Sequence, residues 1–287
     1  MVHRGETGFK RTFRFLWLLT TSTAKHDIAS LAAVIAFYAF FSLFPLLLLA
    51  IYALSVALPD GVTENYLMDL LSPYFPAMKD AHDIIAQNIG QLSSGGNVGL
   101  ISGVTLAWSA SSGFIALQQA LDTIFCTEQQ RSFVARRIIA FLMLIILLLL
   151  TLGSALVLWL SPLVTASPLM QNGLLRWFGF VHGVSRVIFP LSLVAGFIVC
   201  FRYLPSRRID WVFLFPGAIV STLALDLGRE VFVWYVTHIS RYHMIYGGLT
   251  TVMLLVLWMY VGSILVLFGA EVSATLEGVL ESHTDES

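Results

Sequence analysis

The sequence predicts an all-α fold: a polytopic membrane helix bundle with six transmembrane helices and a short amphipathic helical outer loop. Hydrophobic residues make up 57% of the 287 residues and charged residues only 11%, about half the charged share of an ordinary soluble domain. Several apolar runs are long enough to cross a hydrocarbon core about 30 Å thick, in which the backbone must form a helix. Basic residues collect between alternate runs, which is typical of the cytoplasmic side of a membrane protein.

Residues 1–30 are predicted to form a cytoplasmic segment with an interfacial amphipathic helix. Lys10, Arg11 and Arg14 precede a short apolar stretch at 15–19, and polar residues follow at 25–27. The stretch is too short for the apolar core of a signal peptide, and no mature soluble domain follows it. Basic and aromatic side chains in one short segment instead suit the level of the lipid headgroups.

The membrane domain is predicted to cover residues 31–275, and an acidic cytoplasmic tail follows at 276–287. Pro45, in the first span, removes one helical hydrogen bond, which predicts a kink there. An even number of spans places both termini on the same side of the membrane. The six predicted spans are 31–58, 98–122, 138–160, 183–204, 212–238 and 246–275.

The distribution of basic residues predicts that both termini are cytoplasmic. Eleven Lys and Arg residues lie in the N-terminal segment and in the connections after the second and fourth spans, and three lie in the opposite connections. This asymmetry is the positive-inside pattern. The eleven are Arg4, Lys10, Arg11, Arg14, Lys25, Arg131, Arg136, Arg137, Arg202, Arg207 and Arg208, and the three are Lys79, Arg176 and Arg241.

The outer loop, residues 59–97, is the one long connection, and Pro and Gly residues bound two helical stretches within it. In the second stretch, apolar and polar residues take opposite faces, so we expect a short amphipathic pair on the outer surface. Five carboxylates make the loop acidic. They form either a solvated face that packs on the bundle, the preferred interpretation, or a vestibule that collects cations.

Charged residues inside a span are costly and are therefore candidates for function. The fifth span carries Asp226, Arg229 and Glu230, whose spacing places all three on one helix face, with Arg229 one turn from Asp226. The cluster is either a substrate-binding site or a self-neutralised group that fixes helix packing. The internal pair needs no substrate, yet one carboxylate is left over.

Less strongly polar residues give further candidates. The second span contains Trp108 and Ser109, within a stretch of small and hydroxylated residues, and then Gln118. Such residues allow close helix packing, the preferred interpretation, or they line a polar path or mark a broken helix. In the first span, Tyr38 and Ser42 repeat this pattern.

Two candidates lie at or near the ends of the sixth span. Tyr246 belongs to a group of aromatic residues that suits the interfacial belt. Glu271 is expected near the cytoplasmic interface, as a carboxylate that reaches water or caps the helix rather than a buried one. Together with the residues above, these two complete the candidate substrate-binding set.

The sequence offers little support for an enzyme, a metal site or a cofactor. Cys126 and Cys200 are predicted to be free thiols, because both lie near cytoplasmic helix ends and two cysteines make no metal site. The chain lacks a phosphate-binding glycine motif, and no spacing places a nucleophile beside a base on one helix. We therefore expect no catalytic residue and no cofactor.

These residues together resemble the YihY/BrkB family of bacterial inner-membrane proteins, in order and over nearly the whole chain. The resemblance is carried by residues 37–45 (FYAFFSLFP), 108–109 (WS), 117–121 (LQQAL), 205–208 (PSRR), 216–218 (PGA), 226–229 (DLGR) with Tyr235, 245–248 (IYGG) and 267–271 (LFGAE). The resemblance implies six helices in the bacterial inner membrane and a loose association with virulence and envelope lipids. Some members were once labelled ribonuclease BN. Here the seven histidines are scattered, and no basic, aromatic RNA-binding surface is visible, so nucleic acid is not expected as a partner.

Two functions remain open from the sequence. The first is a transporter or flippase-like protein for a lipid or other amphiphile, in which Arg229 binds an anionic headgroup and the two carboxylates hold Arg229 in place. The second is a non-catalytic membrane scaffold or assembly factor for envelope complexes, in which the cluster affects only stability. Membrane lipids are the expected partners of the first, and envelope proteins are those of the second.

Overall fold

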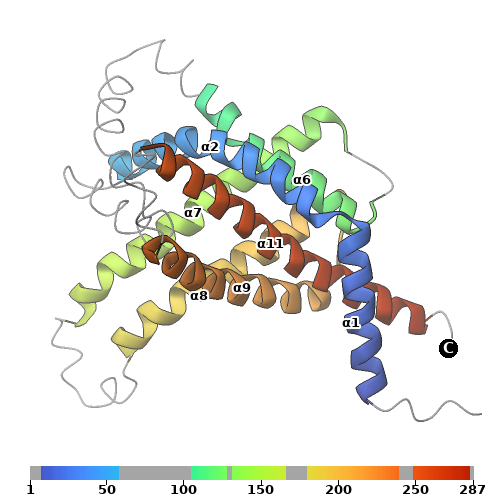
Figure 1. Cartoon of the computed structure of the whole chain (residues 1–287). Helices are drawn as coiled ribbons and strands as arrows, with labels where there is room; N and C mark the ends of the chain where they lie inside the picture. The colour runs from blue at the N-terminus through green and yellow to red at the C-terminus, as the bar shows by residue number, and fades with distance from the viewer. Residues whose placement is uncertain (1–7, 58–104, 128–130, 166–179, 239–247, 285–287) are drawn as a thin grey trace, which may run out of the picture.

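The computed structural model describes residues 8–57, 105–127, 131–165, 180–238 and 248–284, and this part of the chain is helical without strands (Figure 1). The all-α prediction is therefore confirmed for these residues. In chain order the helices are α1 (Gly8–Lys25), α2 (Ile28–Ala57), α6 (Ser112–Ile124), α7 (Phe133–Thr165), α8 (Phe180–Tyr203), α9 (Trp211–His238) and α11 (Gly248–Thr284). Residues 105–110 are also helical.

Three helices are long and apolar enough to cross a membrane on their own: residues 133–150 of α7, 211–238 of α9 and 252–279 of α11. A fourth span results if α1 and α2 are counted as one broken element, bent by 56° between residues 17–25 and 28–43. The described residues therefore give three to four candidate spans, where the sequence predicts six. The predicted outer loop, 59–97, lies outside the described residues.

The bend between α1 and α2 is built from two polar residues. Asp27 has a positive φ of 45°, which aspartate tolerates better than most side chains. Its Oδ1 accepts a hydrogen bond from the Ser30 backbone N–H at 3.4 Å, so it caps the first turn of α2. α1 is thereby directed away from α2 and packs against α11 (Figure 1).

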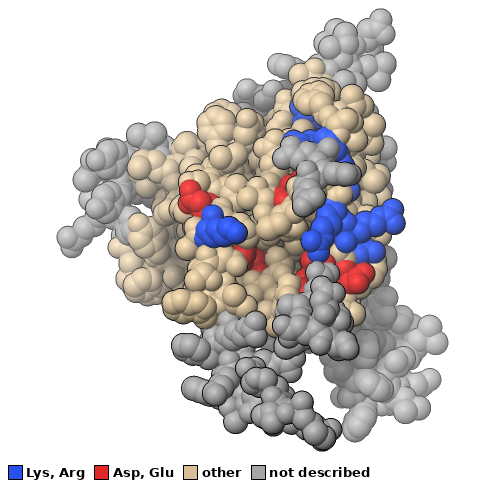
Figure 2. All heavy atoms as spheres, turned by 90° about the vertical axis from the view of Figure 1, so that its right-hand side faces the viewer, with Lys and Arg blue, Asp and Glu red and all other residues tan. Residues whose placement is uncertain are grey.

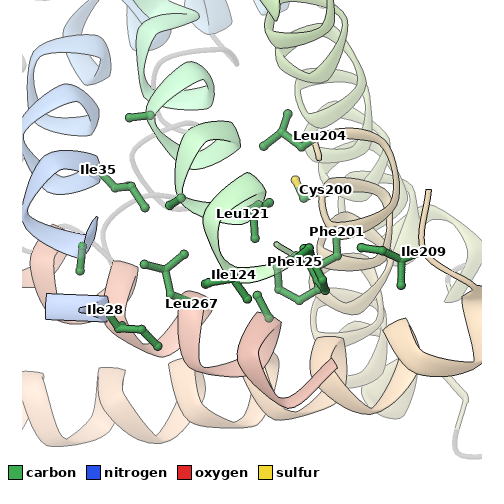
Figure 3. Close-up of a cluster of buried hydrophobic side chains, with 14 of the residues drawn as sticks. Ile28, Ile35, Leu121, Ile124, Phe125, Cys200, Phe201, Leu204, Ile209 and Leu267 are labelled. Atoms are coloured by element: carbon green, nitrogen blue, oxygen red, sulfur yellow. The ribbon is translucent and has the colours of Figure 1, made fainter. Parts of the chain in front are cut away.

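α11 is the central helix of the bundle, and it packs most extensively against α9 and α2. The apolar core contains side chains from α2, α6, α7, α8, α9 and α11 and from the connections that follow α6 and α8. Figure 3 shows several of them converging on one region. The largest are Phe201, Leu121, Ile124, Met143, Leu204, Ile209, Leu214 and Leu267, all of which are almost completely buried.

Large apolar side chains also cover much of the outside of the bundle. On α7, Ile138, Leu142 and Leu149 are each at least half exposed, and on α9 Val212 and Leu223 are more exposed still. An apolar outer surface of this extent is unfavourable in water. It is favourable in lipid, so the apolar surface and the long apolar helices both indicate a membrane protein.

Four parts of the chain meet at one end of the bundle: the α1–α2 bend, the α6–α7 connection, the α8–α9 connection and the C-terminal part of α11. Hydrogen bonds and ion pairs join them, including His26 to Glu271 and Arg207 to Glu277. Figure 2 views the molecule from the side of α1 and the C-terminus, and Lys and Arg side chains gather on this face. The connections that the sequence assigns to the basic side therefore do lie together.

Candidate functional site

The predicted charged cluster lies within α9, far from either end of the helix. Arg229 Nη2 donates to Asp226 Oδ1 at 3.4 Å, and the two side chains are 30% and 64% exposed. Glu230 is also exposed. A rise of 1.5 Å per residue places Asp226 roughly 22 Å along the axis from Trp211. The one-turn ion pair expected from the spacing is therefore present, and it faces out of the described bundle.

The surroundings of this cluster are apolar. An exposed stripe follows the same side of α9 along its length, and the two carboxylates lie along it. Charged groups cost several kcal/mol in a hydrocarbon environment, so water, a polar headgroup or another protein must cover this position. The stripe consists of Val212, Phe215, Ile219, Leu223, Leu227, Val231 and Trp234.

The opposite side of α9 is packed against α11 through glycine and serine. A Cβ atom added to Gly217 would overlap Ser273 Oγ and the Gly269 carbonyl oxygen, and one added to Gly269 would overlap Ser221 Oγ. Ser221 Oγ donates to the Val266 carbonyl oxygen at 3.3 Å. The pattern Gly-Ala-x-Val-Ser occurs at 217–221 and again at 269–273. It is a small-xxx-small motif, a signal that sequence reasoning did not use.

The candidates of the first two predicted spans separate into packed and exposed residues. Ser42 is buried, and a Cβ on Gly113 would lie 3.0 Å from its Oγ, so α2 and α6 approach closely here. Gln118 is completely buried, and neither of its amide atoms has a hydrogen-bond partner among the described residues. Tyr38 is instead exposed. These contacts agree with the helix-packing interpretation of Ser42.

Trp108 is half exposed and lies beside an arginine that the sequence assigns to a connection. The Arg137 guanidinium stacks over the indole ring at 3.9 Å and donates to the Trp108 carbonyl oxygen at 3.2 Å and to Ser111 Oγ at 2.9 Å. Ser109 is partly buried. Helical hydrogen bonds continue across Ser111, whose N–H donates to the Ala107 carbonyl oxygen. Tyr246 lies outside the described residues.

The expectation that Glu271 reaches water is wrong. Its side chain is only 1% exposed, and both carboxylate oxygens contact Nδ1 of His26, at 3.1 and 3.2 Å. The correction has a physical reason: α1 folds back onto α11 at the bend and covers this turn of the helix. The position of a residue along one helix indicates its depth in the membrane, but it does not show whether another segment packs over that residue.

Sequence reasoning also missed a layer of polar contacts at the basic end. Asp122 is buried and accepts hydrogen bonds from the backbone N–H and Oγ of Ser206, at 2.6 and 3.0 Å. Arg207 pairs with Glu277 at 2.6 Å. Arg131 donates to the Leu204 carbonyl oxygen at 3.0 Å, and burial lowers its pKa while the Asp122 carboxylate acts in the opposite direction. These contacts join the connections to the C-terminal part of α11.

Long apolar helices, an apolar outer surface and a polar layer at one end together define a multi-pass helical membrane protein. The comparisons with known proteins agree. The family model described as "Virulence factor BrkB" matches residues 19–287, so the chain belongs to this family, which includes UPF0761 membrane proteins.

Several similar proteins align with much of the chain. The ribonuclease-like protein YfkH of Bacillus subtilis (strain 168) is 29% identical over 239 residues, which are 80% of this chain and 83% of YfkH. A UPF0761 membrane protein of Alteromonas mediterranea is 28% identical over 76% of this chain and 71% of its own length. One from Pelodictyon phaeoclathratiforme is 34% identical over 40% of this chain and 29% of its own length. No solved structure matches the chain.

Proposed function

We propose that this protein is a transporter or flippase-like protein for a lipid or other amphiphile in the cell envelope. The observation that supports the proposal is the cluster of Asp226, Arg229 and Glu230 within an apolar helix, in which both carboxylates are exposed and Arg229 is partly exposed. An anionic headgroup would pair with Arg229, and the acyl chains would lie along the apolar stripe beside it. The proposal gives the cluster a binding role and assigns it no catalytic chemistry, no cofactor and no nucleic-acid partner.

The geometry suits a headgroup better than a buried ion pair. Arg229 has one contact to Asp226 at 3.4 Å, which is long for a charge-assisted hydrogen bond. A guanidinium offers five N–H donors in a fork that matches phosphate, so a single long contact leaves donors for a ligand. In this proposal Asp226 holds the arginine in position through that contact, and Glu230, the next residue in the chain, adds a second carboxylate.

Replacing Arg229 by glutamine is expected to slow lipid movement about tenfold, the size expected from losing one charge-assisted hydrogen bond. The measurement uses proteoliposomes that contain fluorescent phosphatidylglycerol and a quencher added outside, so that the initial rate of quenching reports movement between leaflets. Arg208→Gln is the matched control, because Arg208 is an exposed arginine in the α8–α9 connection, and α9 places Asp226 roughly 22 Å along its axis from Trp211, where the helix begins. Wild-type rates from Arg229→Gln would refute the assignment.

The same exposed face favours a second candidate, a non-catalytic scaffold for envelope complexes. A partner helix would cover the apolar stripe of α9. In the proteoliposome assay this function predicts no lipid movement above that in protein-free vesicles. In this function the cluster affects only stability, so Arg229→Gln should lower the thermal stability in detergent and leave any co-purifying envelope protein bound.

We further propose the full six-span topology in the bacterial inner membrane, with both termini in the cytoplasm. The contacts among the basic connections support this orientation, because the positive-inside pattern assigns that end to the cytoplasm. Cys126 is exposed at this end and Cys200 is buried, so the native Cys126 is a ready topology probe.

Cys126 is expected to resist a membrane-impermeant maleimide in intact spheroplasts and to react in inverted vesicles. The reverse is expected for a cysteine introduced at Gly61, in the predicted outer loop, in a Cys126→Ser background. Labelling of both positions from the same side would contradict the six-span arrangement, and labelling of Cys126 in intact spheroplasts would reverse the orientation.

A further inference from the structure

Three side chains from separate parts of the chain form a contact chain at the basic end. His26 lies in the α1–α2 bend, Cys126 lies two residues after the end of α6, and Glu271 lies on α11. Nδ1 of His26 contacts both oxygens of Glu271 at 3.1 and 3.2 Å, and its Nε2 lies 3.9 Å from Sγ of Cys126. His26 is 100 residues from Cys126 and 245 residues from Glu271 in the sequence, so no local spacing indicates the arrangement.

The chemistry of the three groups assigns each a role. In its ionised form the Glu271 carboxylate only accepts hydrogen bonds, and in that form it holds the imidazole tautomer with hydrogen on Nδ1. The lone pair of Nε2 then faces the Cys126 thiol and can take its proton. A nucleophile beside a base that a third group orients is the arrangement used to activate thiols and hydroxyls.

The solvent exposure of the three side chains increases from the carboxylate to the imidazole to the thiol, as this chemistry requires. Glu271 is 1% exposed and the His26 side chain 13% exposed, so the base is held by the protein. Cys126 is exposed. It has a positive φ of 48°, and its backbone N–H donates to the Thr123 carbonyl oxygen at 3.2 Å. The sulfur is thus presented at the end of α6, outside the core that encloses Cys200.

The arrangement does not suit a metal ion. His26 uses one ring nitrogen for Glu271 and the other for Cys126, so the side chains form a line and do not converge on one point. Within the described ranges, no three His, Cys, Asp or Glu side chains are grouped to hold a metal ion. A thiol and a base in line favour proton transfer instead.

We propose that Cys126 is a nucleophilic thiol activated by His26 and is reversibly modified by a small anionic disulfide. His26 Nε2 takes the thiol proton, and the thiolate attacks one sulfur of the disulfide. A new S–S bond forms to Cys126, the original S–S bond breaks, and the leaving thiolate takes the proton from His26. The Cys126 sulfur is oxidised and the leaving half of the disulfide is reduced, so atoms and electrons balance.

The choice of an anionic disulfide rests on the charge around the site. Lys and Arg side chains gather on the face that contains the α1–α2 bend (Figure 2), and a basic surface attracts anionic small molecules. Exposed Lys25 and Asp27 flank His26 in the chain. The proposal goes beyond the transport function, because it uses none of the α9 cluster.

The first test is the rate of alkylation by iodoacetamide in detergent, read by mass spectrometry. At pH 7 Cys126 is expected to react about tenfold faster in the wild type than in His26→Gln or Glu271→Gln, since an ordinary thiol is mostly protonated there. At pH 9.5 the rates should agree within about twofold, because the thiolate then forms without a base. Cys126→Ser gives the background. Equal rates at pH 7 would overturn the proposal.

The second test needs no folded variant. Oxidised glutathione should add one glutathionyl group to Cys126, and dithiothreitol should remove it. A wild-type protein that acquires no adduct also overturns the proposal.

Discussion

Replacing Gly269 by alanine is expected to lower the free energy of unfolding by about 2 to 3 kcal/mol, the cost of overpacking a tight contact. The added methyl group would overlap Ser221 Oγ and would lie 2.6 Å from the Gly217 carbonyl oxygen. A serine hydroxyl can rotate away, but a backbone oxygen moves only with its helix. The contact between α9 and α11, the largest in the bundle, must therefore loosen.

The measurement is unfolding by SDS titration in mixed micelles, followed by the fluorescence of the seven tryptophans. Gly278→Ala is the matched control on the same helix, because a Cβ there meets nothing within 4 Å. It should leave stability unchanged or raise it by about 0.5 to 1 kcal/mol, the propensity difference between alanine and glycine in a helix. Equal effects of the two substitutions would contradict the packing argument. Adding Ser221→Ala to Gly269→Ala should recover only part of the loss, since the Gly217 carbonyl oxygen remains.

Replacing His26 by leucine is expected to cost about 3 kcal/mol of stability, because it removes the partner of a carboxylate that is only 1% exposed. The Glu271 oxygens would lose both contacts to Nδ1, and the α1–α2 bend would lose its polar attachment to α11. Increased proteolysis within α1 should accompany the loss, since α1 packs against α11 in the described part of the bundle.

A double-mutant cycle separates the energy of the contact between His26 and Glu271 from the effect of changing the shape of each side chain. The variant with both His26→Leu and Glu271→Leu should recover most of the lost stability, because replacing both partners of a buried polar contact by apolar groups of similar shape is often nearly neutral. The same SDS titration gives the coupling energy. A double variant as unstable as the sum of the two single variants would show that the contact contributes no coupling.

The helices could be predicted closely from composition and patterning. The predicted span 212–238 corresponds to α9, Trp211–His238, and the predicted span 138–160 lies within α7, Phe133–Thr165. The ion pair of Asp226 and Arg229 was also predictable, since the two residues are three positions apart on one helix. In all three cases the information is local, because a helix satisfies its own backbone and places neighbours at fixed angles.

The polar layer could not be predicted in the same way. Asp122 and Ser206 are 84 residues apart, and nothing near either residue indicates the other. The exception is the α9–α11 contact, for which the repeated Gly-Ala-x-Val-Ser pattern at 217–221 and 269–273 was available. The pattern indicates that each of the two helices can pack closely against a neighbouring helix, although it does not show that they pack against each other.

Composition and hydropathy alone identify a helical membrane protein, and the sequence places most of its basic residues in a few short segments between apolar runs. Those properties follow from the thickness of the bilayer, the cost of an unpaired backbone in lipid and the placement of charge, each of which acts on a continuous stretch of chain. The burial of Glu271 beneath His26, and the position of Cys126 within reach of the same imidazole, become visible only in the packed structure. Burial and contact depend on which segments fold over one another, and a helix pattern leaves that choice open.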